Sequence, residues 1–86
     1  MTRYRVRIRI TPRAGILDPQ GQAVERALSS LGFGGVGAVR VGRNVEFSLE
    51  SGTEAEAREE ARLMCERLLA NPVTEDYTLD AVDPAA

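Results

Sequence analysis

Polar and apolar residues alternate strictly near the start of this chain. Residues 3–10 read RYRVRIRI, so an extended chain would carry its arginines on one face and its apolar side chains on the other. This two-residue period predicts a half-buried β-strand whose polar face meets water or a partner. The same alternation returns at 45–50 and at 73–82, and each of these segments predicts a further strand.

A helix is predicted between the first two strands. Asp18 can cap the first free N–H groups, and Pro19 suits the first helical position because its φ is preset and it has no N–H. Gly32 and Phe33 then predict a Schellman ending, with the glycine in a left-handed conformation. One apolar stripe connects the two ends and consists of Val24, Ala27, Leu28 and Leu31.

The segment after this helix predicts a β-hairpin. A glycine pair, Gly34-Gly35, leads into an apolar segment at 36–41, which we interpret as a strand. The tripeptide Gly42-Arg43-Asn44 has the residue types of a tight turn, and the strand at 45–50 follows it.

A second helix is predicted to begin at Thr53, which forms a capping box with Glu56. Its charged face has oppositely charged residues at supporting spacing, Glu54 with Arg58 and Arg62 with Glu66. Asn71-Pro72 ends it. The residues predicted for the buried stripe of this helix are Ala57, Ala61, Met64, Cys65 and Leu68. In the last strand, the residues predicted to point toward the core are Tyr77, Leu79 and Ala81.

The predicted order of elements is therefore β-α-β-β-α-β. With right-handed crossovers this order gives an α+β, ferredoxin-like fold, a four-stranded antiparallel sheet with both helices on one face and the first strand in the centre. We expect residues 1–86 to form a single domain, with 83–86 as a flexible tail. A domain of this size buries a modest core, so association with other chains would stabilise it.

Composition argues against several classes of partner. The chain has eleven basic and thirteen acidic residues, and this net charge of −2 is opposite to what phosphate binding requires. Nucleic acid is therefore not expected as a partner, and the central strands lack the aromatic residues of an RNA-binding sheet. No apolar run could cross a membrane and no secretory signal is visible, so we expect a cytoplasmic protein that does not bind membranes.

Residues that could support catalysis are scarce. The chain has no histidine, which removes the usual general base and metal ligand. Cys65 is the single cysteine and lies on the apolar stripe of a helix, where a buried, unreactive thiol is the simpler interpretation. We therefore expect no catalytic residue, no bound cofactor and no metal site in this chain.

The arginines of the first strand allow two interpretations. They could recognise phosphate or an acidic partner. They could also pair across strands with carboxylates at suitable positions of the neighbouring strands, an arrangement worth about 0.2–1 kcal/mol for each pair. The net negative charge favours cross-strand pairing, and the carboxylates that could take part are Glu46, Glu50, Asp76 and Asp80.

The turn at 12–17, which joins the central strand to the first helix, is the candidate binding loop. Functional residues gather on loops held by rigid elements, although this turn could also be a simple connector. A small-molecule regulatory domain of the ACT type has a similar Pro-Gly turn in this place, so a sensor remains an alternative. The candidate interface residues in and beside the turn are Arg13, Gly15, Asp18 and Gln20.

Three segments together resemble one protein family. They read PRAGILDPQGQAVERALSSLGF, VRVGRNVEFSLE and MCERLLANPVTEDYTLD. The similarity covers nearly the whole chain, from about Tyr4 to Leu79, and leaves the DPAA tail outside. They are similar to PurS, the small subunit of bacterial and archaeal phosphoribosylformylglycinamidine synthase, a glutamine-dependent ligase that uses ATP in the fourth step of purine synthesis.

The resemblance implies a noncatalytic subunit that bridges two others. In this family a PurQ-type glutaminase subunit releases ammonia, and a PurL-type synthetase subunit uses ATP and Mg²⁺. PurS would join the two as a dimer or larger oligomer, such as a tetramer, and assist ammonia transfer while binding no cofactor itself. Ammonia would otherwise equilibrate with water and protons, so a sealed contact between subunits would serve the chemistry.

Overall fold

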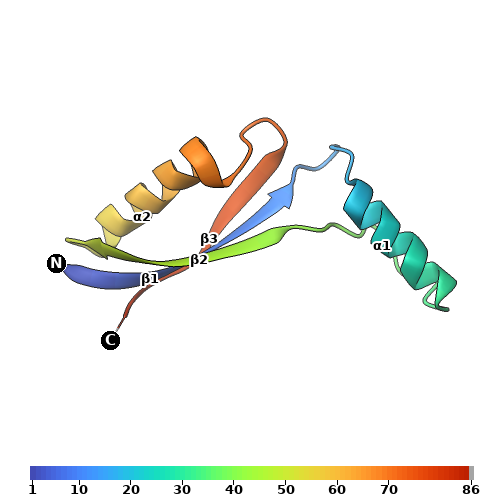
Figure 1. Ribbon diagram of the computed structural model, residues 1–86, viewed down its shortest axis with the longest axis horizontal. Coiled ribbons are helices and arrows are strands. Elements are labelled where there is room, and N and C mark those ends of the chain that lie inside the picture. Colours follow the sequence, from blue (N-terminus) through green and yellow to red (C-terminus); the bar gives the residue numbers. More distant parts are fainter. Residues whose placement is uncertain (86) are drawn as a thin grey trace.

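The computed structural model describes residues 1–85, and Figure 1 shows that it is elongated, with extents of 52 × 29 × 14 Å. A three-stranded antiparallel sheet and one helix form the main body. A second helix, α1, projects beyond one end of the sheet. The elements are β1 (Thr2–Pro12), α1 (Pro19–Ser30), β2 (Arg43–Ser51), α2 (Glu54–Met64), the π-helical turn η1 (Cys65–Leu69) and β3 (Glu75–Pro84).

The sheet has the order β2-β1-β3, so the first strand is central, as predicted. Its apolar face packs under α2, and Ile8 and Ile10 are fully buried there. The residues of α2 and η1 that meet them are small, Ala57, Ala61 and Cys65, all fully buried, which lets the helix approach the sheet closely. Thr53 caps α2 through its Oγ1, which accepts from the Glu56 N–H at 3.1 Å.

The opposite face of the sheet carries the arginines of β1, and cross-strand pairing is confirmed. Figure 1 shows no helix over this face of the main body, so the pairs are open to solvent. Exposed ion pairs are individually weak, so each of these pairs contributes little to the free energy of unfolding. The pairs of β1 are Arg3 with Glu50 at 2.8 Å, Arg7 with Glu46 at 3.0 Å and Arg9 with Asp80 at 3.2 Å. Asp76 pairs instead with Arg13, directly after β1, at 3.2 Å.

A β-bulge in β3 changes which residues face the core. Arg7 is opposite Ala81 while Ile8 is opposite Leu79, so Asp80 is the extra residue. The bulge turns the Asp80 carboxylate toward Arg9, which donates to it through Nε and Nη2 at 3.3 and 3.2 Å. The prediction that Ala81 points inward is therefore wrong, and Val82, 1% exposed, takes that place.

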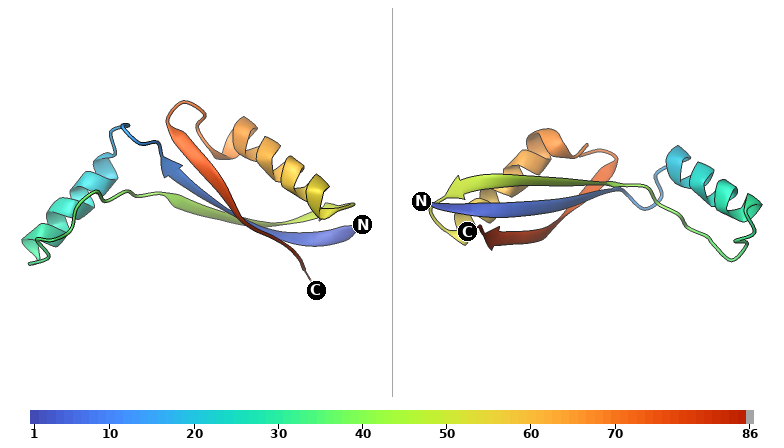
Figure 2. Two further views of the ribbon diagram at one scale, coloured as in Figure 1. Left: turned by 180° about the vertical axis from the view of Figure 1, so that it is seen from behind. Right: turned by 60° about the horizontal axis from the view of Figure 1, so that its bottom comes forward.

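The ferredoxin-like arrangement is not formed within this chain. The described residues contain a three-stranded sheet and not four strands, because 36–41 is not a strand. The predicted turn at 42–44 is also wrong, since Arg43 and Asn44 belong to β2 and pair with Ile10 and Arg9. Of the two helices, only α2 lies over the sheet; α1 makes no extensive contact with any strand (Figure 2).

Two smaller predictions also need correction. β3 continues to Pro84, and the Ala85 N–H donates to the Arg3 carbonyl at 2.8 Å, so residues 83–85 are not a loose tail. The rest of the predicted tail, Ala86, lies outside the described residues. Leu68 was assigned to the buried stripe of the second helix but is 83% exposed, because the π-helical turn changes the angular positions of the residues that follow.

The core of β1 makes a first testable prediction. Ile8→Ala should lower the free energy of unfolding by about 2–5 kcal/mol, because it leaves a cavity between the sheet and α2. Val73→Ala is the matched control, since Val73 is 73% exposed and its truncation should change the free energy by less than about 0.5 kcal/mol. Urea denaturation at one fixed chain concentration measures both. Equal effects would show that β1 does not form the core.

Candidate functional site

The turn between β1 and α1 is organised by the Asp18 carboxylate. One oxygen accepts from the Gly21 N–H at 3.0 Å and caps α1, as predicted. The other accepts from the Val41 N–H at 2.9 Å, a bond that sequence reasoning missed because it joins residues far apart in the chain. These two N–H groups lower the pKa of Asp18, with the bond from Val41 the larger cause. Asp18 therefore ties the start of α1 to the segment that leads into β2.

Gly21 lets that segment pass close to the helix. A Cβ at this position would lie 2.3 Å from the Val39 carbonyl oxygen and 2.5 Å from an Asp18 oxygen. The Val39 N–H in turn donates to Glu25 Oε1 at 3.3 Å. Residues 14–41 therefore form one unit, which we call the α1 arm.

The α1 arm ends as the sequence predicts. Gly32 has a φ of 101°, its N–H donates to the Ser29 carbonyl, and the Phe33 N–H donates to the Leu28 carbonyl at 3.0 Å. These are the two bonds of a Schellman motif. The helix is thus closed at both ends by local contacts alone.

Two arginines fasten the arm to the sheet. Arg40 donates through Nη2 to the Pro12 and Arg13 carbonyls, the second at 2.6 Å. Arg13 donates through Nε to the Glu75 carbonyl at 3.3 Å and lies 3.2 Å from an Asp76 oxygen. Arg13, predicted only as an interface residue, therefore also has a role in the fold, although nearly half of its side chain remains exposed.

The remaining candidates of the turn are open to solvent. Gly15 has a φ of 82°, which explains the glycine, and space lies open beside its Cα. Gln20 is exposed on the first turn of α1. The four predicted residues thus lie in one short stretch, but Asp18, with only 9% of its side chain exposed, acts within the fold.

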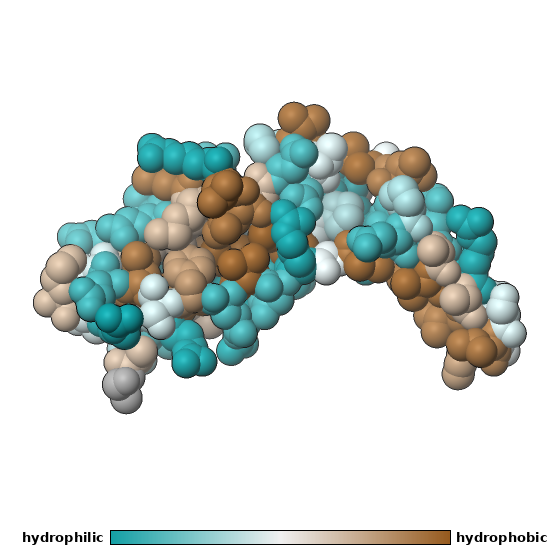
Figure 3. All heavy atoms as spheres, viewed as in Figure 1, coloured by the Kyte–Doolittle hydropathy of each residue, from teal (hydrophilic) through white to brown (hydrophobic). Residues whose placement is uncertain are grey.

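A second surface, which we call the α2–β2 groove, was not predicted. It has a volume of about 650 Å³ and contains mainly apolar side chains. Figure 3 shows such side chains gathered between α2 and β2. The signal in the sequence was the presence of Leu63 and Leu69, two apolar residues that lie outside the predicted buried stripe of the second helix. The groove is lined by Val45, Phe47, Leu63, Met64, Leu68 and Leu69, with Glu60 and Arg67 as its charged residues.

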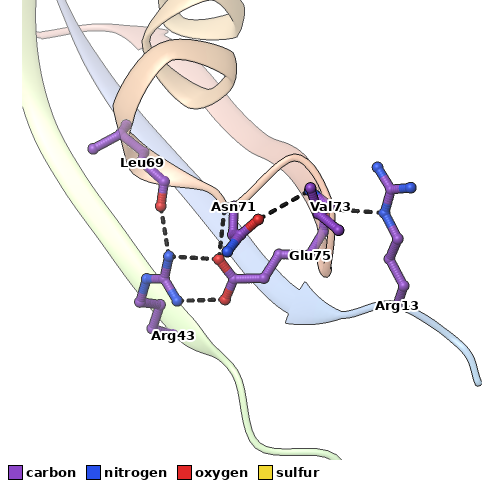
Figure 4. Close-up of polar contacts among 6 residues, drawn as sticks. All are labelled: Arg13, Arg43, Leu69, Asn71, Val73 and Glu75. Carbon is purple, nitrogen blue, oxygen red and sulfur yellow. Dashed lines mark hydrogen bonds and ion pairs between the residues drawn. The ribbon is translucent and has the colours of Figure 1, made fainter. Parts of the chain in front are cut away.

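A polar network holds the end of the sheet next to this groove (Figure 4). Arg43 of β2 donates to both Glu75 oxygens, at 2.6 and 2.9 Å, and to the Leu69 carbonyl at 2.6 Å. Glu75 also accepts from the Asn71 N–H at 2.7 Å. The Arg43 guanidinium lowers the pKa of Glu75, and the Asn71 N–H lowers it further. Sequence reasoning missed this network because it assigned Arg43 to a turn.

Comparison with known proteins identifies the family. The family model for PurS, described as phosphoribosylformylglycinamidine (FGAM) synthase, matches residues 5–83. The chain belongs to the PurS family. It is 44% identical over 77 residues to phosphoribosylformylglycinamidine synthase subunit PurS of a Synechocystis species, covering 90% of this chain and 77% of the relative.

Solved structures of the PurS family have the same fold. The structure of Thermus thermophilus PurS matches with a TM-score of 0.85 and 44% identity, covering 98% of this chain and 99% of that one. A chain in the structure of PurLQS from Thermotoga maritima matches with a TM-score of 0.82 and 29% identity, covering 99% of this chain and all of that one. The match extends over α1 as well as the sheet, so the elongated shape recurs in the family.

No group of three or more possible metal ligands occurs among residues 1–85 of this PurS-family chain, and none of the helices described there is long and apolar enough to cross a membrane. Cys65 is fully buried; burial raises the pKa of its thiol, and Glu66 raises it further. The thiol is therefore poorly suited to act as a nucleophile.

Asp18 makes a prediction about pH. Asp18→Asn keeps an oxygen to cap α1 but loses the negative charge and one acceptor. At pH 7 its melting temperature should be about 4–8 °C lower, as expected for one net hydrogen bond in a domain of this size. Because folding lowers the pKa of Asp18, its contribution is complete above the unfolded value of about 4 and is lost as pH falls through the lower folded value.

The difference between wild type and Asp18→Asn should therefore shrink as the pH is lowered toward the folded pKa. Thermal unfolding followed by circular dichroism across the acidic range measures it. The matched control is Asp83→Asn, a carboxylate for which we identify no hydrogen bond. A difference for Asp18→Asn that does not depend on pH would contradict the assigned role of its charge.

Proposed function

We propose that this PurS-family chain is the noncatalytic subunit through which the FGAM synthase of purine biosynthesis brings its glutaminase and synthetase subunits together. The observation that carries the proposal is the family match over residues 5–83. The noncatalytic role is supported by a sequence that has no histidine and whose single cysteine is buried. A small domain of this kind can serve the reaction by contact with other subunits. The PurLQS structure of T. maritima, which contains a chain of this fold, supports such an assembly.

The chemistry explains why a connecting subunit is useful. The glutaminase subunit, of the PurQ type, releases ammonia from glutamine, and the synthetase subunit, of the PurL type, consumes it with ATP. Ammonia that reaches solvent is protonated and is no longer a nucleophile. A subunit that keeps the two sites in sealed contact therefore assists the transfer. On this proposal ATP and Mg²⁺ bind to the synthetase subunit and this chain binds no cofactor.

We also propose that the chain associates with itself, as a dimer or tetramer. Several large apolar side chains are exposed in the single chain, including Leu31 at 73%, Leu68 at 83% and Phe33 at 57%. Exposed apolar surface on this scale in a small domain marks a contact with another molecule. The four-stranded, ferredoxin-like arrangement that the sequence predicts belongs, on this proposal, to the associated form.

The bridging role predicts a specific pattern of activity. The chain alone should show no glutaminase, ATPase or synthetase activity. Leaving it out of a mixture of the two large subunits should reduce glutamine-dependent FGAM synthesis at least tenfold, while synthesis from added ammonium salt falls much less. Product formation with each nitrogen donor measures the two rates, and the ammonia reaction is the internal control. Equal glutamine-dependent rates with and without the chain would rule out the bridging role.

The turn between β1 and α1 makes a separate prediction about assembly. Replacing Arg13 and Gln20 together by alanine should weaken binding to the large subunits, because both side chains are exposed on a turn held rigidly by Asp18 and Arg40. The melting temperature should fall by no more than a few degrees, since the ion pair of Arg13 is exposed.

Isothermal titration calorimetry against the large subunits measures this effect. The control replaces exposed residues of the same two types elsewhere, Gln22 on α1 and Arg58 on α2. Unchanged affinity in the Arg13 and Gln20 variant would show that the turn is only a connector.

A further inference from the structure

We propose that a pocket between η1 and β3, which we call the η1–β3 pocket, receives a lysine or arginine side chain of one of the two large subunits. This contact presupposes the bridging role proposed above and gives one of its partners a defined chemistry. Three features of the chain support it. The pocket has apolar walls, it holds a carboxylate that is only partly neutralised, and it adjoins the turn between β1 and α1.

The η1–β3 pocket lies on the opposite side of η1 from the α2–β2 groove, since residues of β3 and not of β2 complete its lining. It has a volume of about 410 Å³. Cys65 and Ala70, both buried, form its floor. Pro72 and the half-buried ring of Tyr77 add further apolar surface. The pocket therefore offers packing for the apolar part of a side chain as well as polar contacts.

Glu66 is the carboxylate that is only partly neutralised. Its Oε2 pairs with Arg62 and accepts from the Tyr77 hydroxyl at 3.2 Å. The Arg62 guanidinium also donates to both oxygens of Glu59, at 3.0 and 2.5 Å. One arginine therefore serves two carboxylates, which leaves one negative charge in excess. For Oε1 of Glu66 we identify no donor among residues 1–85, so this oxygen can accept from a partner.

The other charges of the pocket balance in pairs. Glu75 meets Arg43 at 2.6 Å and has both oxygens bonded, and its side chain is only 17% exposed. It is therefore not available to a ligand. Asp76 is 64% exposed and meets Arg13 through one oxygen, at 3.2 Å. Its other oxygen and Oε1 of Glu66 are thus the acceptors that a positively charged group would find in the pocket.

A lysine or arginine side chain matches both parts of this lining. Its aliphatic stem can pack against Pro72 and the Tyr77 ring while its charged end meets the carboxylates. Charge-assisted hydrogen bonds of this kind are stronger in a partly apolar pocket than in water. An acidic side chain would be repelled by Glu66, and the chain's net charge of −2 likewise favours a basic partner surface.

The pocket is held in shape and lies where a large subunit could reach it. The turn that leads into β3 is fixed by the Asn71 N–H, which donates to Glu75, and by Asn71 Oδ1, which accepts from the Val73 N–H at 2.9 Å (Figure 4). Val73 itself is 73% exposed and can cover an entering segment. The Arg13 N–H donates to the Thr74 carbonyl at 2.9 Å, so the pocket adjoins the turn between β1 and α1. One partner could therefore contact that turn and fill the pocket together.

Glu66→Gln tests this contact in the full chain. The amide keeps an oxygen that can accept from Tyr77 but loses the negative charge. Isothermal titration calorimetry against each large subunit should show a Kd that is roughly tenfold to a hundredfold higher for the subunit that fills the pocket. The matched control is Glu59→Gln, which removes the same charge from the same Arg62 group at a residue that does not line the pocket. Its Kd should change by no more than about twofold. Equal changes in the two variants, or no change in either, would overturn the inference.

The salt dependence of binding gives a second readout that a merely structural role would not change. The affinity of the unmodified chain should fall as ionic strength rises, because salt screens the ionic contact. The decrease should be smaller for Glu66→Gln and unaltered for Glu59→Gln. The same salt dependence in all three chains would show that no charge in the pocket meets the partner.

Two further measurements separate this contact from the other proposals. Light scattering should give Glu66→Gln the molar mass of the unmodified chain, and a lower mass would mean that another copy fills the pocket. At saturating concentration the variant should restore glutamine-dependent synthesis, because the pocket holds a partner and takes no part in the chemistry; synthesis that stays low would overturn this role. An unmodified chain that binds neither large subunit would contradict the proposed function itself, whereas normal binding by Glu66→Gln would overturn only the pocket contact.

Discussion

The pairing of β2 with β1 along its whole length determines the shape of this molecule. It takes Arg43 and Asn44 out of a turn and into the sheet, so the chain before them leaves the sheet in a straight line. Everything at the far end follows from that direction: the α1 arm stands free, the inner face of β2 is half covered, and an apolar groove remains beside α2. Arg43 reinforces the same pairing by its bonds to Glu75 and Leu69.

The two candidate surfaces of the chain differ in character. The turn between β1 and α1 is exposed, is held by the bonds of Asp18 and Arg40, and presents both polar and apolar side chains, so it suits contacts that orient other subunits. The α2–β2 groove is apolar and suits a permanent contact with another chain. Separating the two kinds of contact in this way would let a small subunit associate with itself and still present a defined surface to larger partners.

Three arginines on the polar face of β1 take part in ion pairs between strands. Arg3, Arg7 and Arg9 each meet a carboxylate from a neighbouring strand, and the bulge at Asp80 turns one of these carboxylates into position. These pairs and the net charge of −2 both disfavour phosphate as a ligand of this face. The match to the PurS family model rules against the alternative interpretation of the chain as an ACT-like sensor. The charge pattern does not distinguish between these two interpretations.

Local rules determined much of this protein from its sequence. The alternation in 3–10, the cap at Asp18 and the Schellman ending at Gly32 depend on neighbours within a few residues, and each was predicted correctly. The central place of β1 and its ion pairs followed from element order and register. Of the candidate site, the position of the turn was predictable, whereas the second acceptor role of Asp18 was not, because Val41 lies in a distant part of the chain.

Tertiary structure decided the rest. Gly42-Arg43-Asn44 has the composition of a turn and can equally begin a strand; only its pairing with residues at the far end of β1 selects the strand. The bulge at Asp80 reverses which side of β3 is buried, and the π-helical turn moves Leu68 out to solvent, both through contacts between elements. Local propensity differs little between such alternatives, so the contacts that settle them are those between residues far apart in the chain.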